Sequence, residues 1–110
     1  MKDLRLYLLQ RVTAAMLVPL IAVHLIVIYM ATAKGLSAAD ILARTRGSIT
    51  WGVFYSLFVV LAAVHGAIGV NAVCREWTAL SAPARERVMW ASGALLFLLG
   101  MRAVVAVVLS

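Results

Sequence analysis

Acidic residues, and charged residues in general, are scarce in this sequence. Of 110 residues, 4 are Asp or Glu, and charged residues of both signs make up 13%. Apolar residues reach 65%, against about 45–50% in an average soluble protein, and the mean hydropathy is +1.06. A small soluble domain leaves much of its surface in water, so it has no way to hide that much apolar area. The composition therefore excludes a soluble globular enzyme and a disordered tail, and it indicates a membrane protein.

Cysteine is almost absent, since Cys74 is the single one. One cysteine permits no internal disulfide, which excludes a secreted disulfide scaffold. No A-x-A-type cleavage site follows a short apolar region, so we expect the first apolar segment to be retained. The net charge of +6 would suggest nucleic-acid binding in a soluble chain, but here it is explained by basic residues that flank membrane spans. We expect no nucleic-acid partner.

Basic residues divide the chain into three long apolar segments. Uncharged residues fill the stretches between Arg11 and Lys34 and between Arg46 and Arg75, and a third apolar segment follows Arg87. Crossing the hydrocarbon takes about 20 helical residues, and lipid offers the backbone no hydrogen-bond partners, so only helices are plausible. We predict an all-α membrane protein, one domain over residues 1–110, with transmembrane helices near 12–33, 50–74 and 86–109.

The distribution of Lys and Arg predicts an orientation. The N-terminus and the second loop together carry six basic residues, which are Lys2, Arg5, Arg11, Arg75, Arg85 and Arg87. The first loop carries three, which are Lys34, Arg44 and Arg46. The positive-inside rule then places the N-terminus in the cytoplasm and the C-terminus outside.

Local signals predict two helix starts. Ser37 with Asp40 resembles a capping box, which predicts a short surface helix in the first loop. Pro83 suits the first turn of a helix, so the third span is expected to begin near it. Pro19, inside the first span, is expected to loosen or kink that helix.

Two histidines, His24 and His65, lie inside predicted spans. Ionisable groups in a membrane are costly, so each is a candidate functional residue, and a neutral imidazole is a common axial ligand of haem iron. The alternative is a neutral histidine that is hydrogen-bonded to a neighbouring helix. Gly66 and Gly69 beside His65 favour either close helix packing or the approach of a flat cofactor.

Other candidates lie near the cytoplasmic ends of the first two spans. Arg11 fits either a snorkelling anchor or a donor to a quinone oxygen or a haem propionate, and Tyr7 is one turn earlier on the same face. Glu76 lies near the face that His65 occupies, and Trp77 follows it at the expected depth of the membrane interface.

Two segments carry a resemblance to a known family. They are Leu9-Gln10-Arg11-Val12-Thr13, which opens the first span, and the pattern of His65, Gly69, Val73, Glu76 and Trp77, which closes the second. With three spans, the chain resembles over nearly its whole length the cytochrome b membrane-anchor subunits of succinate dehydrogenase and fumarate reductase. It departs from the usual motifs at Tyr7, Ala14, Asn71, Glu76 and Trp77. Which of the two anchor subunits it matches stays open, although His24 in the first span favours the cytochrome b subunit.

The resemblance implies a function and a set of partners. Such anchors bind b-type haem (heme b) and a quinone, either ubiquinone or menaquinone, and join a flavoprotein subunit, an iron–sulfur subunit and a second membrane anchor in the bacterial inner membrane. By position, His65 matches the axial haem ligand and His24 a candidate for a second ligand. Arg11 matches a contact to quinone or propionate, and Trp77 and Tyr7 match quinone contacts.

Two other classes of protein were weighed. A cofactor-free three-helix scaffold or assembly protein remains an alternative, and it would contain no haem. A small multidrug-type transporter has about this length, but such chains have four spans and an acidic residue inside the first, and neither feature is predicted here.

Overall fold

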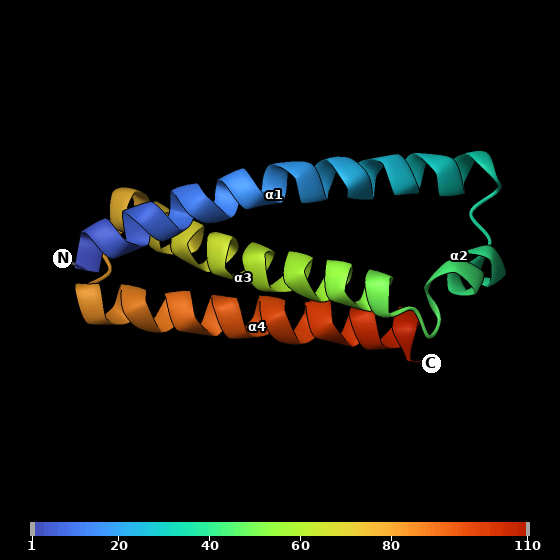
Figure 1. Cartoon of the computed structure of the whole chain (residues 1–110). Coiled ribbons are helices and arrows are strands. Elements are labelled where there is room, and N and C mark those ends of the chain that lie inside the picture. Colours follow the sequence, from blue (N-terminus) through green and yellow to red (C-terminus); the bar gives the residue numbers. More distant parts are fainter. Residues whose placement is uncertain (1, 110) are drawn as a thin grey trace.

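The computed structural model describes residues 2–109 and consists of four helices in the order α1 (Lys2–Ala33), α2 (Ala38–Thr45), α3 (Ile49–Trp77) and α4 (Ala82–Val108). Within those residues there is no strand. The central helix is α3, which runs antiparallel to α1 on one side and to α4 on the other, while α2 packs against the end of α4 (Figure 1). The predicted all-α class is confirmed.

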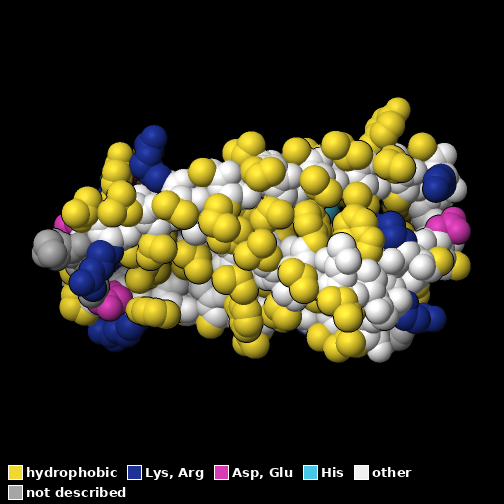
Figure 2. Space-filling view, in the orientation of Figure 1, with side chains coloured by type: hydrophobic (Ala, Val, Ile, Leu, Met, Phe, Trp, Pro, Cys, Tyr) yellow, Lys and Arg dark blue, Asp and Glu magenta, His cyan; other side chains and the backbone are white. Residues whose placement is uncertain are grey.

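Three of the helices are long and apolar enough to cross a membrane. They contain 32, 29 and 27 residues, and the molecule extends 48 Å along its long axis, against about 30 Å of hydrocarbon in a bilayer. Lys and Arg side chains gather at the two ends, and apolar side chains cover most of the length between them (Figure 2). The three predicted spans are therefore confirmed as helices.

The first span begins earlier than its apolar segment. Helix α1 starts at Lys2, whereas the sequence predicted a start near residue 12. Charged residues end the part of a helix that suits hydrocarbon, but they do not break its backbone hydrogen bonds. Asp3 in the first turn also favours a helix start there, because a carboxylate interacts well with the positive end of the helix dipole. Pro19 lies inside α1 without ending it.

Serine side chains cap the N-termini of the other three helices. Ser37 accepts a hydrogen bond from the backbone N–H of Asp40 over 3.3 Å, which confirms the short helix predicted in the first loop. Ser48 and Ser81 cap α3 and α4 in the same way. Pro83 lies in the first turn of α4, as predicted.

Helix α2 is fastened to the C-terminal end of α4 by backbone and side-chain hydrogen bonds. Thr45 is 1% exposed, and its hydroxyl oxygen lies 2.6 Å from the carbonyl oxygen of Val107 and 3.1 Å from that of Ile41. The backbone N–H of Gly47 donates to the carbonyl of Val108 over 2.7 Å, from a residue with φ of +73° that suits glycine. The sequence did not single out Thr45, because its partner lies far along the chain.

Small residues set the distance between α3 and α4. A Cβ atom at Gly100 would lie 2.6 Å from Cγ1 of Val59, and one at Gly66 would lie 2.8 Å from Cδ1 of Leu96. At Gly93 the nearest atom would be Cβ of Ala67, at 3.2 Å. Missing side chains let two helices approach closely, which is the usual basis of helix association in lipid.

Gly100→Ala is therefore expected to destabilise the helix pair by about 1–3 kcal/mol, a range typical of overpacking. Val59 is β-branched and stiff, so it has little freedom to turn away from the added methyl group. The measurement is thermal unfolding of the purified protein in detergent. Gly52→Ala is the matched control, because its Cβ would meet Val108 at an ordinary 3.5 Å. Equal behaviour of the two variants would contradict the packing argument.

Candidate functional site

The two helices α1 and α3 bring Thr13 and His65 together near the middle of their contact. Oγ1 of Thr13 lies 3.2 Å from Nδ1 of His65, and Thr13 is 3% exposed. The His65 side chain itself is half-buried. A histidine in an apolar span is thus held by a partner on a neighbouring helix, across 52 residues of sequence.

The hydrogen bonds of Thr13 favour one of the two proton positions on the His65 ring. The Thr13 hydroxyl has one hydrogen to donate, and its shortest acceptor is the carbonyl oxygen of Leu9 at 2.7 Å, which leaves its oxygen free to accept. In the arrangement that satisfies both contacts of Thr13, Nδ1 of His65 donates to the hydroxyl oxygen and Nε2 carries the lone pair. Among residues 2–109, no second hydrogen-bond partner of the His65 ring is present.

The glycines beside His65 face the neighbouring helices. Gly69 faces α1, where a Cβ would lie 3.6 Å from Nε2 of Gln10, and Gly66 faces Leu96 of α4. Close helix packing accounts for both positions, which is one of the two interpretations that the sequence allowed. Gln10 adds a polar feature, because its Oε1 is buried and has no hydrogen-bond partner.

His24 lies well away from His65. Its ring packs edge-on against Tyr55 and Phe58 of α3, with ring centroids 6.1 and 5.2 Å apart, and its Nδ1 is buried without a hydrogen-bond partner. Since His24 is 11 residues beyond Thr13 on α1, it lies about 16 Å further along the helix than the level of His65. The structure does not bring the two histidines to one position, so they do not form a pair around one iron atom.

Arg11 and Tyr7 meet on the surface of α1. The Arg11 guanidinium lies 5.7 Å from the centroid of the Tyr7 ring, a cation–π distance, and both side chains are exposed. Trp77 is the last residue of α3 and is 80% exposed. Trp77 lies ten residues further along α3 than the residues that are level with Arg11, so it lies about 15 Å along the helix from that level. The structure groups Arg11 with Tyr7 and leaves Trp77 apart from them.

A small cleft lies between α1 and α3 at the end that contains the N-terminus. Its volume is about 170 Å³, and it is lined by Asp3, Leu6, Tyr7, Gln10, Ile68, Asn71, Ala72 and Arg75. Polar side chains from both helices thus face one opening. Sequence reasoning placed Tyr7 here but missed Gln10, Asn71 and Arg75 as cleft residues, because only the register between the two helices brings them together.

Within the described residues 2–109, no group of three or more His, Cys, Asp or Glu side chains is placed to hold a metal ion. A metal site made entirely by these side chains is therefore not supported. An iron that is already held by a porphyrin requires only axial side-chain ligands, so a haem does not depend on such a group.

Thr13→Val is expected to lower the free energy of unfolding by about 1 kcal/mol or more. Valine keeps the shape of threonine but leaves the half-buried Nδ1 of His65 without its partner. Denaturant unfolding in detergent measures the change. Thr32→Val is the matched control, since Thr32 is exposed on the same helix, and a change within about 0.5 kcal/mol is expected there. A loss at Thr13 no larger than at Thr32 would show that the contact contributes nothing to stability.

Comparison with known proteins assigns this chain to a family. The family model described as the succinate dehydrogenase/fumarate reductase transmembrane subunit matches residues 2–109. No curated protein matches, and no solved structure matches. The three helices that are long enough to cross a membrane agree with the family, because the family is one of transmembrane subunits. The chain therefore belongs to the family of transmembrane subunits of succinate dehydrogenase and fumarate reductase, and it is a multi-pass membrane protein.

Proposed function

We propose that this chain binds a b-type haem and a quinone and passes electrons from an iron–sulfur subunit to the quinone. The observation that carries the proposal is the His65 ring, whose Nδ1 has a hydrogen-bond partner on a neighbouring helix, which leaves Nε2 for a ligand. Nε2 of a neutral imidazole, with the other ring nitrogen engaged in a hydrogen bond, is the form in which histidine ligates haem iron.

The residues present fit a haem that is shared with another subunit. The cleft of about 170 Å³ between α1 and α3 is not lined by His65, so we do not place the haem in it. Much of the apolar surface of this chain is exposed, including Leu25, Ile26 and Leu98, and is available to a second anchor subunit. We therefore propose that a second anchor subunit supplies the other axial ligand and covers the haem.

The side chains of this chain have separate tasks in the proposal. His65 would hold the iron through Nε2, and Thr13 would orient the imidazole through its contact with Nδ1. A bound haem supplies a one-electron carrier between the cluster and the quinone. His24 lies about 16 Å along the helix from this level, so it is not a second ligand of the same haem.

For the quinone we propose the α1–α3 cleft near the N-terminal end. Tyr7 lines this cleft and provides a hydroxyl and a flat ring. Arg11 does not line the cleft, but its guanidinium lies beside Tyr7 and provides a positive charge for a quinone oxygen or a haem propionate. Gln10 and Asn71 line the same cleft and add further hydrogen-bonding groups. Trp77 lies about 15 Å from the level of Arg11, so we leave it out of this head-group site.

The surroundings of the proposed quinone site fit docking of soluble subunits. We propose that the end with the N-terminus and the α3–α4 loop faces the cytoplasm of a bacterium, because it has the larger number of Lys and Arg residues. An iron–sulfur subunit that docks there, together with its flavoprotein partner, gives the electron the shortest path to a quinone at this end.

One observation favours the cofactor-free alternative. Gly66 and Gly69 both face neighbouring helices, so helix packing alone explains the small residues beside His65. A scaffold would carry no haem in the assembled complex, which makes the haem spectrum the observation that separates the two functions.

His65→Ala is expected to remove or strongly perturb the b-type haem spectrum of the purified complex, because the iron loses its ligand from this chain. His24→Ala is the matched control and is expected to leave the spectrum unchanged. Co-purification of the partner subunits verifies assembly in both cases. A normal spectrum in an assembled His65→Ala complex would overturn the assignment of the ligand.

Arg11→Ala is expected to lower the rate of quinone reduction by about tenfold or more, since it removes a charge-assisted interaction with the quinone oxygen. Succinate oxidation with an artificial acceptor is expected to continue at its normal rate, because that reaction bypasses the membrane site. Arg46→Ala, at the opposite end of the molecule, serves as the control. Equal loss of both activities in Arg11→Ala would point to failed assembly and would contradict a quinone contact.

A further inference from the structure

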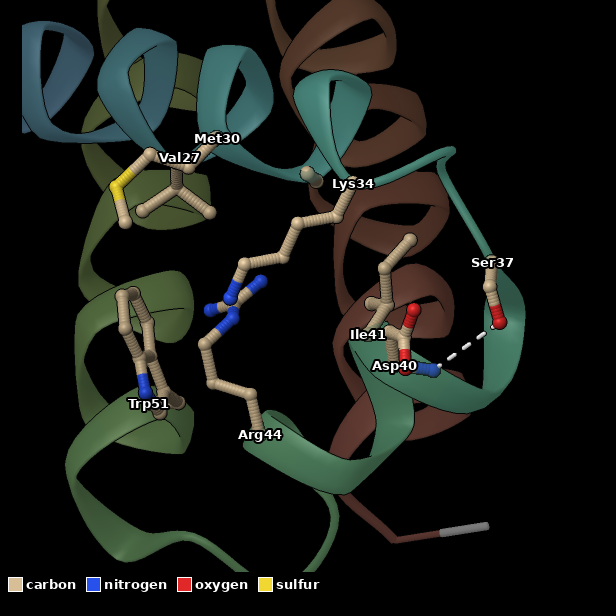
Figure 3. Close-up of a pocket in the computed structure, with 9 residues that line it drawn as sticks. Val27, Met30, Lys34, Ser37, Asp40, Ile41, Arg44 and Trp51 are labelled. Atoms are coloured by element: carbon tan, nitrogen blue, oxygen red, sulfur yellow. Dashed lines mark hydrogen bonds between the residues drawn. The ribbon is translucent and has the colours of Figure 1, made fainter.

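A second and larger cavity lies at the opposite end of the molecule from the proposed quinone site. It has a volume of about 370 Å³ and lies where the C-terminal end of α1, the short helix α2 and the N-terminal end of α3 come together (Figure 3). Its lining consists of Val27, Met30, Ala31, Lys34, Ser37, Asp40, Ile41, Arg44 and Trp51. Nothing in the haem and quinone proposal uses any of these side chains.

Two cationic side chains extend into this cavity from different elements. Lys34 comes from the end of α1 and Arg44 from α2, and Figure 3 shows both directed toward the space in front of Trp51. The Arg44 guanidinium lies 4.3 Å from the centroid of the Trp51 ring, so its plane is held by a cation–π contact. Two like charges that share one cavity repel each other unless an anion lies with them.

Arg44 has an unsatisfied donor. Its Nη1 is buried and has no hydrogen-bond partner. A buried donor without an acceptor costs free energy, and more so on a charged group, which makes such atoms rare in proteins. The guanidinium is therefore held in place by Trp51 while one of its nitrogen atoms is left for an acceptor that this chain does not provide.

The charge of the lining defines what fits. Asp40 also lines the cavity, and among residues 2–109 no hydrogen bond joins its carboxylate to Lys34 or Arg44. Asp40 lies in the first turn of α2, where a carboxylate favours the helix start. Two cations and one carboxylate leave a net charge of about +1, which matches one monoanionic phosphodiester better than a multiply charged anion.

The remaining lining is apolar and continues onto the outer surface of α1. Val27, Ala31 and Ile41 line the cavity with hydrocarbon, and Met30, which is 53% exposed, lies on the outer surface of α1. Trp51, with an apolar ring and a polar N–H, suits the boundary between hydrocarbon and head groups. A ligand that places a phosphate on Arg44 and an apolar chain along Val27 and Met30 satisfies both halves of the lining.

We propose that this cavity binds the head group of an anionic phospholipid, with its phosphate held between Arg44 and Lys34 and an acyl chain along the end of α1. The bound phosphate supplies the acceptor that Arg44 lacks and separates the two cations. The lipid then joins α1, α2 and α3 at the end where α1 and α3 diverge (Figure 1). The site is independent of His65, so it stands whether or not the chain binds haem.

The test uses the purified complex in nanodiscs of phosphatidylcholine, with phosphatidylglycerol added in increasing fractions. Native mass spectrometry measures bound phosphatidylglycerol, and thermal unfolding measures the stabilisation. Arg44→Gln and Lys34→Gln are each expected to weaken binding of phosphatidylglycerol by about tenfold, because each removes one charge-assisted interaction with the phosphate. Arg46→Gln is the matched control, because Arg46 is a cation of the same loop that does not line this cavity, and its binding is expected to be unchanged.

Each arm of the experiment has a result that would overturn the proposal. Lys34→Gln leaves the Arg44–Trp51 contact in place, so it tests the site even if Arg44→Gln disturbs α2. Equal binding of phosphatidylglycerol by Lys34→Gln and Arg46→Gln would show that this cavity is not the lipid site. Equal retention of phosphatidylcholine and phosphatidylglycerol would contradict the charge argument. Inorganic phosphate that stabilises the lipid-free complex as strongly as phosphatidylglycerol would assign the site to a free anion and overturn the lipid.

Discussion

The need to pair polar groups inside the membrane limits how α1 can lie against α3, and the hydrogen bond between Thr13 and His65 is the clearest case. Hydrocarbon offers no partner to a polar group, so a histidine inside a span has to be paired within the protein. With Thr13 opposite His65, Gln10 comes opposite Gly69, and His24 comes opposite Tyr55 and Phe58. These pairs belong to one alignment of α1 and α3, in which the hydrogen bond between Thr13 and His65 satisfies a polar group that lipid would leave unpaired.

Several polar atoms remain unpaired although the helices pack well. Oε1 of Gln10, Nδ1 of His24 and Nη1 of Arg44 are buried without hydrogen-bond partners, at three levels along α1 and its neighbours. Such atoms are costly in a finished interior, and in our proposals a cofactor, a lipid or another subunit supplies the missing partners. This agrees with a family whose members are subunits of a larger complex.

The two sides of α3 differ in kind. Toward α4 the contact is close and apolar, and Gly66, Gly93 and Gly100 lie where the two helices approach closely. Toward α1 it contains the polar residues and the cleft near the N-terminal end, and the two helices diverge toward α2 (Figure 1). Helices α3 and α4 are thus the closely packed pair, and α1 provides the side chains that we expect to contact ligands.

The sequence by itself determined the class of the fold, the three membrane spans and the starts of two helices. The apolar segments between Arg11 and Lys34 and between Arg46 and Arg75 are long enough to span a bilayer, and only helices satisfy their own backbone there. The caps at Ser37 and the start near Pro83 were also predicted, because capping depends on residues within one turn. The early start of α1 was missed, since hydropathy reports where a helix suits lipid and not where its hydrogen bonds begin.

Only the tertiary structure decided which side chains meet. Nothing within a few residues of His65 indicates that Thr13 holds it, nor does the sequence near Lys34 indicate that Arg44 and Trp51 lie in the same cavity. The separation of His24 from His65 likewise depends on the alignment of two antiparallel helices. That alignment arises from side-chain packing and from polar pairing across distant segments, and such terms act between helices after each helix has been specified by its own local sequence.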